Sequence, residues 1–480
     1  MLAVAACGDG STPPDRQGPC GDRLTLDIAE VVLVDADAEC LQLSSEAGEY
    51  VLAYLDPAFI EAARHNHPDY GPTSETFDVE VSLVAPGASA AARLAPSALQ
   101  QPVSHLRDTR LSAVDAEPWV IGDTLRHAFD QGVAPELMQV VAIHEDYFVV
   151  AVPRADTALF APWEARLREV FDLYLNEADH VLNTMFGGTR PTSNSDGQFL
   201  VLAKVDPGLA GAAYPDRLQM LIGTSQFVTT VQQYLLLAHE MTHVKQFQYS
   251  FPRPAESQTA WTQWAVEGGA KFMEGELLRR HVGLELLSNW EGWRTPTSDP
   301  FLNAYRQVAG DFSSGTVSMG YGPGAAVIRD FVQRLVVHGM TVDAAARLVL
   351  RSSLHGWFGC WGFENCTTDG LAPQMTAALG APFDPITAVL RVAASAAADD
   401  QTSNPELQQS SFFDLAGPRN NNGNPLFLPY MKQVGDGQSS ASNQHLRGTV
   451  GAFRVVDDGA GATYRLTGSV PLRWMVTRMR

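Results

Sequence analysis

Apolar residues recur three or four positions apart through the middle of the chain, which is the spacing of one face of an α-helix. The clearest case runs over residues 162–185, where the apolar positions are Leu167, Val170, Phe171, Tyr174, Leu175, Ala178 and Leu182. Further stretches of helical composition occupy 231–249, 261–282, 324–337 and 342–350. The pattern predicts a mainly α-helical core.

Both ends of the chain show a different pattern, in which short apolar runs alternate with clusters of Asp, Gly and Ser. Such punctuation is typical of β-structure. It covers residues 24–84 and returns after residue 397, with late strands expected at 449–456 and 462–466. Within the core, strands are expected at 199–205 and 218–222, with a strand pair over 140–152 around His144-Glu145-Asp146.

These patterns predict an α+β protein in which a small sheet accompanies the helical core. We expect a leader and tether at 1–19, an N-terminal β-module at 20–104, a central domain at 105–396 and a C-terminal β-module at 397–480. Both β-modules are expected to be sandwich-like. A stretch rich in Pro, Ala and Ser at 85–102 is interpreted as a linker.

The segment His239-Glu240-Met241-Thr242-His243 lies in a run without Gly or Pro. Two histidines four residues apart on a helix differ by about 40° around its axis, so both imidazoles project from one face. This spacing suits two ligands of a zinc ion, and Glu240 lies where it can act as a general base on a water molecule. The alternative is an ordinary amphipathic helix with two half-buried histidines.

A catalytic zinc site needs a third protein ligand and an open fourth position. Glu267 follows His243 by 24 residues (267 − 243), which leaves room for a turn and a second helix that packs against the first. Small residues after Glu267 would let the two helices approach closely. The alternative is a solvated helix carboxylate.

The string Trp264-x-x-Glu267-Gly268-x-Ala270-x-Phe272 resembles the third-ligand helix of the gluzincin zinc peptidases. The resemblance implies a mainly α-helical, thermolysin-like catalytic core and a site with His239, His243 and Glu267 as Zn²⁺ ligands. In aminopeptidase N-like gluzincins, a Tyr beyond the third ligand hydrogen-bonds the developing oxyanion. Tyr321 precedes an apolar helix as that Tyr does, with Tyr305 and His338 as weaker candidates and a packed loop Tyr as the alternative.

The order of segments over residues 120–350 looks most like secreted bacterial hyicolysin-type peptidases, although only the zinc helices are specific. Two departures matter. Asp196 is not part of a full acidic loop, which makes calcium doubtful. The segment Gly211-Ala212-Ala213-Tyr214 is similar to the substrate-aligning strand of aminopeptidases but lacks the Glu that binds a free α-amine there. This departure favours an endopeptidase.

The 480 residues include 54 acidic and 33 basic side chains, with a formal net charge of -21. Such a charge repels nucleic-acid phosphates, so a nucleic-acid partner is not expected. No stretch has the ~18–20 consecutive apolar residues of a membrane-spanning helix. The expected partner is a protein or peptide substrate, and the oligomeric state is not predicted.

The first residues resemble a bacterial lipobox, Val4-Ala5-Ala6-Cys7, followed by a tether rich in Gly, Ser and Pro. This pattern predicts a lipid anchor on Cys7 and an extracytoplasmic location, either on the cell envelope or secreted. There is no basic n-region and the apolar run is short, so we expect a clipped leader whose true start lies upstream, with a chance match as the alternative. The other cysteines, which are Cys20, Cys40, Cys360 and Cys366, could form two local disulfides or remain buried thiols.

The sequence therefore predicts a zinc-dependent peptidase, with an endopeptidase favoured and a segment before Gly122 that could act as a propeptide. One alternative is an inactive surface lipoprotein whose β-modules bind protein or glycan. The intact Glu240 argues against it, because a structural relic has no need for that carboxylate. Hydrolysis of a non-peptide amide is a further alternative.

Overall fold

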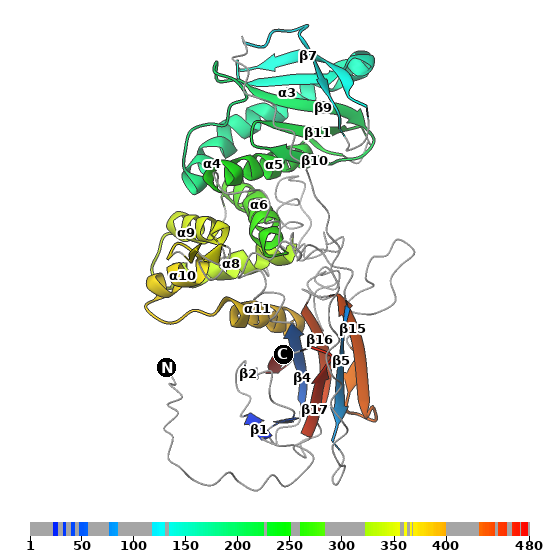
Figure 1. Cartoon of the computed structure of the whole chain (residues 1–480), viewed down its shortest axis with the longest axis vertical. Coiled ribbons are helices and arrows are strands. Elements are labelled where there is room, and N and C mark those ends of the chain that lie inside the picture. The colour runs from blue at the N-terminus through cyan, green and yellow to red at the C-terminus, as the bar shows by residue number, and fades with distance from the viewer. Residues whose placement is uncertain are drawn as a thin grey trace.

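The computed structural model describes residues 23–26, 32–34, 40–43, 48–55, 76–84, 118–129, 134–224, 228–250, 260–283, 322–355, 360–361, 365–366, 368–399, 432–446, 450–457, 463–470 and 472–478. Helices and sheets both contribute, so the fold is α+β as predicted. In Figure 1 a mixed sheet lies at one end, helices follow, and a β-sandwich lies at the other end.

A six-stranded sheet with the order β10-β11-β9-β8-β7-β6 forms the first layer. Pairs β8–β9 and β9–β11 are parallel, and the other neighbours are antiparallel. The strands are β6 (Thr124–His127), β7 (Glu136–His144), β8 (Phe148–Pro153), β9 (Phe199–Asp206), β10 (Gly211–Tyr214) and β11 (Arg217–Gly223).

Helices pack against the apolar face of this sheet and bury the periodic positions of the 162–185 segment. Leu167, Val170, Phe171 and Tyr174 belong to one core cluster together with Phe148 and Phe199 from the sheet. The helices of this layer are α3 (Glu164–Leu173), a π-helical stretch η3 (Tyr174–Ala178), α4 (Asp179–Phe186) and α5 (Thr230–Ser250), after the short turns η1 (Arg154–Asp156), α2 (Thr157–Phe160) and η2 (Ala161–Trp163).

The chain then continues through a helical layer, and its longest helix, α6, lies against α5 and α8. The helices are α6 (Ala260–His281), α8 (Gly322–Val337), α9 (Val342–Leu354), α10 (Leu371–Leu379) and α11 (Pro385–Asp399). The hairpin of β12 (Cys360–Trp361) and β13 (Asn365–Cys366) pairs Cys360 with Cys366 along the backbone. A disulfide between them stays a prediction, while Cys7 and Cys20 lie outside the described residues.

The strands from the two ends of the chain form a single sandwich. One sheet has the order β1-β3-β17-β5-β15 and the other β14-β16-β4-β18-β2, so each sheet combines early and late strands. The early strands are β1 (Arg23–Leu26), β2 (Val32–Val34), β3 (Cys40–Leu43), β4 (Gly48–Leu55) and β5 (Thr76–Leu83). The late strands are β14 (Gln433–Val434), β15 (Ser440–Leu446), β16 (Val450–Asp457), β17 (Thr463–Gly468) and β18 (Arg473–Arg478).

This pairing corrects the expectation of separate N-terminal and C-terminal β-modules. Strand β4 lies between β16 and β18, and β2 pairs with β18. The hydrophobic pattern shows that a segment is a strand, but it does not identify the partner of that strand when hundreds of residues intervene. The two expected modules are therefore halves of one structure.

Strand β4 joins the sandwich to the helical layer because both of its faces are buried. Tyr50, Leu52 and Tyr54 face the interior of the sandwich. Val51 and Ala53 belong instead to the large core cluster that includes residues of α11. Because α11 contacts β4, β16 and β18, the helix covers the outer face of that sheet.

The predicted elements of the core agree with the observed ones to within a few residues, including the strand pair around His144. The sequence analysis gave no bounds for β6, α10, α11, β15 or β18. The predicted linker at 85–102 lies outside the described residues.

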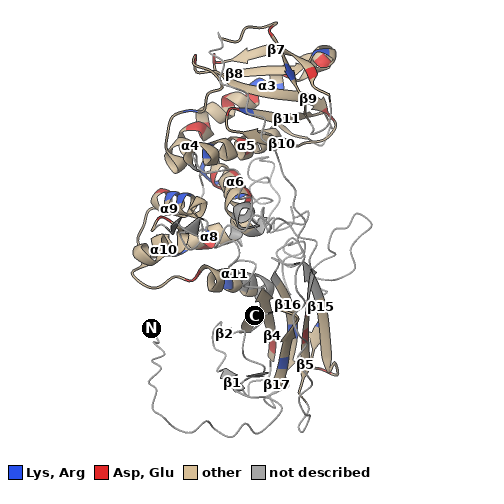
Figure 2. Cartoon of the chain, viewed as in Figure 1, with Lys and Arg blue, Asp and Glu red and all other residues tan. Residues whose placement is uncertain are grey.

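None of the described helices is both long and apolar enough to cross a membrane. Basic and acidic side chains both occur along helices such as α3 (Figure 2).

Replacement of Trp474 by Ala should destabilise the sandwich by about 3–5 kcal/mol, because it removes a large buried ring from the core. Trp474 is 2% exposed, and its ring centroid lies 4.9 Å from that of Tyr54. The measurement is urea unfolding followed by circular dichroism. Val337→Ala is the control, since Val337 is 77% exposed and its loss should change the free energy by less than about 0.5 kcal/mol. Equal effects of the two variants would contradict the described packing.

Candidate metal centre

Helix α5 carries both histidines of the predicted motif on one buried face. His239 is 7% exposed and His243 is 6% exposed. The two rings are nearly perpendicular, at 86°, with centroids 4.7 Å apart. The i, i+4 spacing therefore directs both imidazoles into the same space, as the helical geometry requires.

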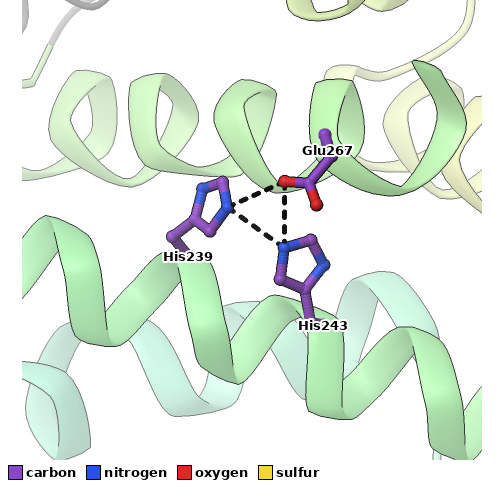
Figure 3. Close-up of side chains that lie close together, drawn as sticks. All are labelled: His239, His243 and Glu267. Carbon is purple, nitrogen blue, oxygen red and sulfur yellow. Dashed lines mark hydrogen bonds and ion pairs between the residues drawn. The ribbon is translucent and has the colours of Figure 1, made fainter. Parts of the chain in front are cut away.

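Helix α6 brings Glu267 to the same point from the opposite side (Figure 3). The two helices approach closely at Gly269, where a Cβ atom would lie 2.9 Å from Nε2 of Gln246. That amide nitrogen donates a hydrogen bond of 3.0 Å to the carbonyl of Val266. The small residue after Glu267 thus permits a direct bridge between the helices, in agreement with the prediction from the sequence.

The three predicted ligand atoms form a compact triangle. Nε2 of His239 lies 3.0 Å from Nε2 of His243, and Oε2 of Glu267 lies 3.2 Å and 3.3 Å from these two nitrogens. Zinc–ligand bonds of 2.0–2.1 Å at tetrahedral angles separate neighbouring ligands by about 3.3–3.4 Å. The two helices therefore present the donors within about 0.4 Å of the separation that a tetrahedral zinc ion requires.

Each histidine is held through its second nitrogen. Nδ1 of His239 donates to Oε1 of Glu274 at 2.8 Å, and Nδ1 of His243 donates to Oε1 of Gln246 at 2.9 Å. Lys271 donates in turn to Oε2 of Glu274 at 2.9 Å. Hydrogen bonds of this kind fix the ring orientation, and here they direct Nε2 of both rings towards Glu267.

The sequence analysis did not identify Glu274, Lys271 or Gln246. A signal was present, because Glu267, Lys271 and Glu274 follow an i, i+4, i+7 spacing that places them on one face of α6. Gln246 lies three residues after His243 on the same face of α5. Residues three, four or seven positions after a predicted ligand on the same helix are therefore candidates for hydrogen bonds that orient the ligands.

Negative charge dominates the electrostatics of the centre. Burial lowers the pKa of His239, but its hydrogen bonds to Glu267 and Glu274 outweigh this effect and raise that pKa to about 10. Burial raises the pKa of Glu267, but the hydrogen bonds from both histidines lower it by more. The pKa of Glu267 therefore lies below its ordinary value. The site thus favours a bound cation, either a proton or a metal ion.

Glu240 directly follows His239 on α5, and it is 6% exposed. Its burial raises its pKa above the ordinary value, and the charges of His243 and His239 only partly offset the rise. A Cβ atom on Gly211 of β10 would lie 2.6 Å from Oε1 of Glu240, so this strand runs directly past the carboxylate. The Glu240 carboxylate therefore lies against an edge strand of the sheet.

The other candidates from the sequence do not join this group. Tyr321 and Tyr305 lie outside the described residues, so the predicted oxyanion donor stays a prediction. His338 is exposed after the C-terminal end of α8 and is not among the clustered donors.

No profile of a known protein family matches this chain, and no curated protein matches it. Several solved structures are similar to part of it. Two of them are Legionella pneumophila aminopeptidase A in complex with aspartic acid (12% identity, TM-score 0.27) and a mutant two-domain M1 zinc metallopeptidase bound to L-arginine (15% identity, TM-score 0.28). The matches cover 54% and 56% of this chain, but only 26% and 50% of those chains. The functional argument therefore rests on the side chains described above.

Zinc affinity should rise with pH. Because the pKa of His239 in the metal-free protein is about 10, an ion that binds below this pH must displace a proton. The apparent association constant should therefore increase about tenfold per pH unit between neutral pH and that pKa. Competition with a chromophoric chelator at several pH values measures it. An affinity that is independent of pH would contradict the assigned protonation of His239.

Replacement of Glu274 by Gln should weaken zinc binding by about 10–100-fold, because the variant keeps the shape but removes the charge that orients His239. The same competition assay measures the effect. Glu169→Gln on α3 is the matched control, since Glu169 is exposed and away from the centre. An unchanged affinity in Glu274→Gln would show that this hydrogen bond does not support the ligand.

Proposed function

We propose that this protein is a zinc-dependent peptidase that cleaves within peptide chains. His239, His243 and Glu267 would hold the ion and Glu240 would act as the general base. The observation that carries the proposal is the triangle of ligand atoms, with separations of 3.0, 3.2 and 3.3 Å. A glutamate beside such a triangle is the arrangement that metal-assisted hydrolysis requires.

Zinc, when bound here, polarises the carbonyl of a scissile amide and lowers the pKa of water. Glu240 accepts the proton of the attacking water molecule and transfers it to the leaving amine. Its burial supports this role, because the raised pKa makes the carboxylate a stronger base. Glu274 and Gln246 keep the two imidazoles oriented through the reaction. Tyr321 remains the proposed hydrogen-bond donor to the oxyanion.

Strand β10 supports a peptide substrate. It is the outermost strand of the six-stranded sheet, it contacts α5, and it passes Glu240 at Gly211. An extended peptide can pair with such an edge through backbone hydrogen bonds. The strand Gly211–Tyr214 has the sequence GAAY and carries no carboxylate for a free α-amine. This composition favours cleavage within a chain over removal of its first residue.

The proposed setting is outside the cytoplasm, with Cys7 as the site of a lipid anchor. The lipobox-like sequence Val4-Ala5-Ala6-Cys7 and the tether that follows it support this proposal. Expression of the chain in a bacterium, followed by metabolic labelling with a fatty acid, tests the anchor. Label that persists in Cys7→Ser would contradict it.

Glu240→Gln should retain about one zinc ion per chain and lose hydrolysis by about 10²–10⁴-fold, because the amide cannot accept the proton. The assay uses an internally quenched peptide with a blocked amino terminus and a blocked carboxyl terminus, with zinc measured by elemental analysis in the same samples. Turnover by the wild type shows cleavage within a chain. His239→Ala should lose both metal and activity.

Two results would contradict the proposal. Undiminished hydrolysis by Glu240→Gln would exclude this residue as the base. Cleavage by the wild type only of peptides with a free α-amine would retain the metal chemistry but replace the endopeptidase with an aminopeptidase.

A further inference from the structure

A second group of metal-binding side chains lies on the hairpin between β7 and β8. His144 is the last residue of β7, Glu145 follows in the turn, and Asp172 projects from α3. One donor atom from each residue lies within 4.8 Å of the other two. The hairpin and α3 are separated in sequence, since Asp172 follows His144 by 28 residues. The fold brings the three side chains together.

His144 is the anchor of this group. Its side chain is buried, with the residue 6% exposed, and Nε2 lies 2.9 Å from Oδ1 of Asp172. The ring packs against Phe171 with the centroids 5.7 Å apart. The imidazole is thus held in one orientation, with Nε2 directed towards Asp172.

The carboxylates lie at the surface. Glu145 is exposed, and the side chain of Asp172 is 56% exposed. A buried nitrogen donor below two solvated oxygen donors leaves open positions for water, which is the arrangement of a three-ligand site with exchangeable partners. Neither α5 nor α6 contributes to it, so it is separate from the candidate metal centre.

We propose that His144, Glu145 and Asp172 form a second site for a divalent transition-type cation such as Zn²⁺. One imidazole with two carboxylates is a mixed nitrogen and oxygen donor set, which suits zinc or cobalt better than calcium or magnesium, whose ligands are oxygens. Two carboxylates around one imidazole also supply the negative charge that a dication needs.

The second site should bind more weakly than the candidate metal centre. His239 and His243 both donate through Nδ1 to a fixed acceptor, whereas Nδ1 of His144 is buried without a hydrogen-bond partner in the described part of the chain. Loss of such a partner lowers metal affinity by about 10–100-fold. The two ions should therefore bind in two steps.

The bound ion would join the hairpin turn to α3. These elements already meet through the hydrogen bond between His144 and Asp172, and the ion would add Glu145 to the connection. The site would thus stabilise the outer part of the six-stranded sheet, and it does not depend on the proposed hydrolysis.

Equilibrium dialysis of the full chain against zinc, followed by elemental analysis, tests the proposal. Wild type should bind two ions per chain in two steps. His144→Ala and Asp172→Asn should bind one, at the affinity of the first step. Asp146→Asn is the matched control, because it changes the neighbouring turn carboxylate outside the group and should still bind two.

His239→Ala isolates the second site, since it should lose the tight ion and retain the weak one. A single ion in the wild type across the whole titration would overturn the proposal. Two ions in both His144→Ala and Asp172→Asn would also overturn it, because the weak ion would then lie elsewhere. Asp172→Asn decides the result if His144→Ala fails to fold, since Asp172 lies at the surface.

Discussion

The structure around the candidate metal centre depends on the concentration of negative charge between α5 and α6. Glu240, Glu267 and Glu274 converge there with two imidazoles, and all five side chains are wholly or largely buried. Carboxylates withdrawn from water need a positive partner. Lys271 supplies one, and a proton or metal ion must supply the rest. The raised pKa of His239 and its hydrogen bonds to Glu267 and Glu274 are consequences of this constraint.

Much of this centre could be predicted from the sequence, because both of its helices are strongly defined by local signals. His239 and His243 are fixed relative to one another by helical spacing alone, and Glu267 needs only one helix–helix contact. The position of β10 beside Glu240 could not be predicted in the same way. It depends on the order of strands in the sheet, which a run as short as Gly211–Tyr214 does not encode.

The same distinction holds for the whole fold. Elements with a local sequence signal could be predicted, whereas contacts between distant segments could not. The helix over 162–185 and the strand pair around His144 follow from spacing and composition. The sandwich does not, because the apolar run over β4 indicates a strand buried on both faces but not the strands that pair with it. The partners of β4 also come from the far end of the chain, and pairing over such a separation leaves no periodic signal.

The shared sandwich also has a consequence for biosynthesis. During translation β4 emerges early, but its neighbours β16 and β18 emerge only after the whole helical region has been made. During synthesis from the amino terminus, the early strands therefore keep exposed edges until the late strands have been made. The metal-binding helices α5 and α6 lie between the two halves of the sandwich in sequence, so they can form before the sandwich is complete.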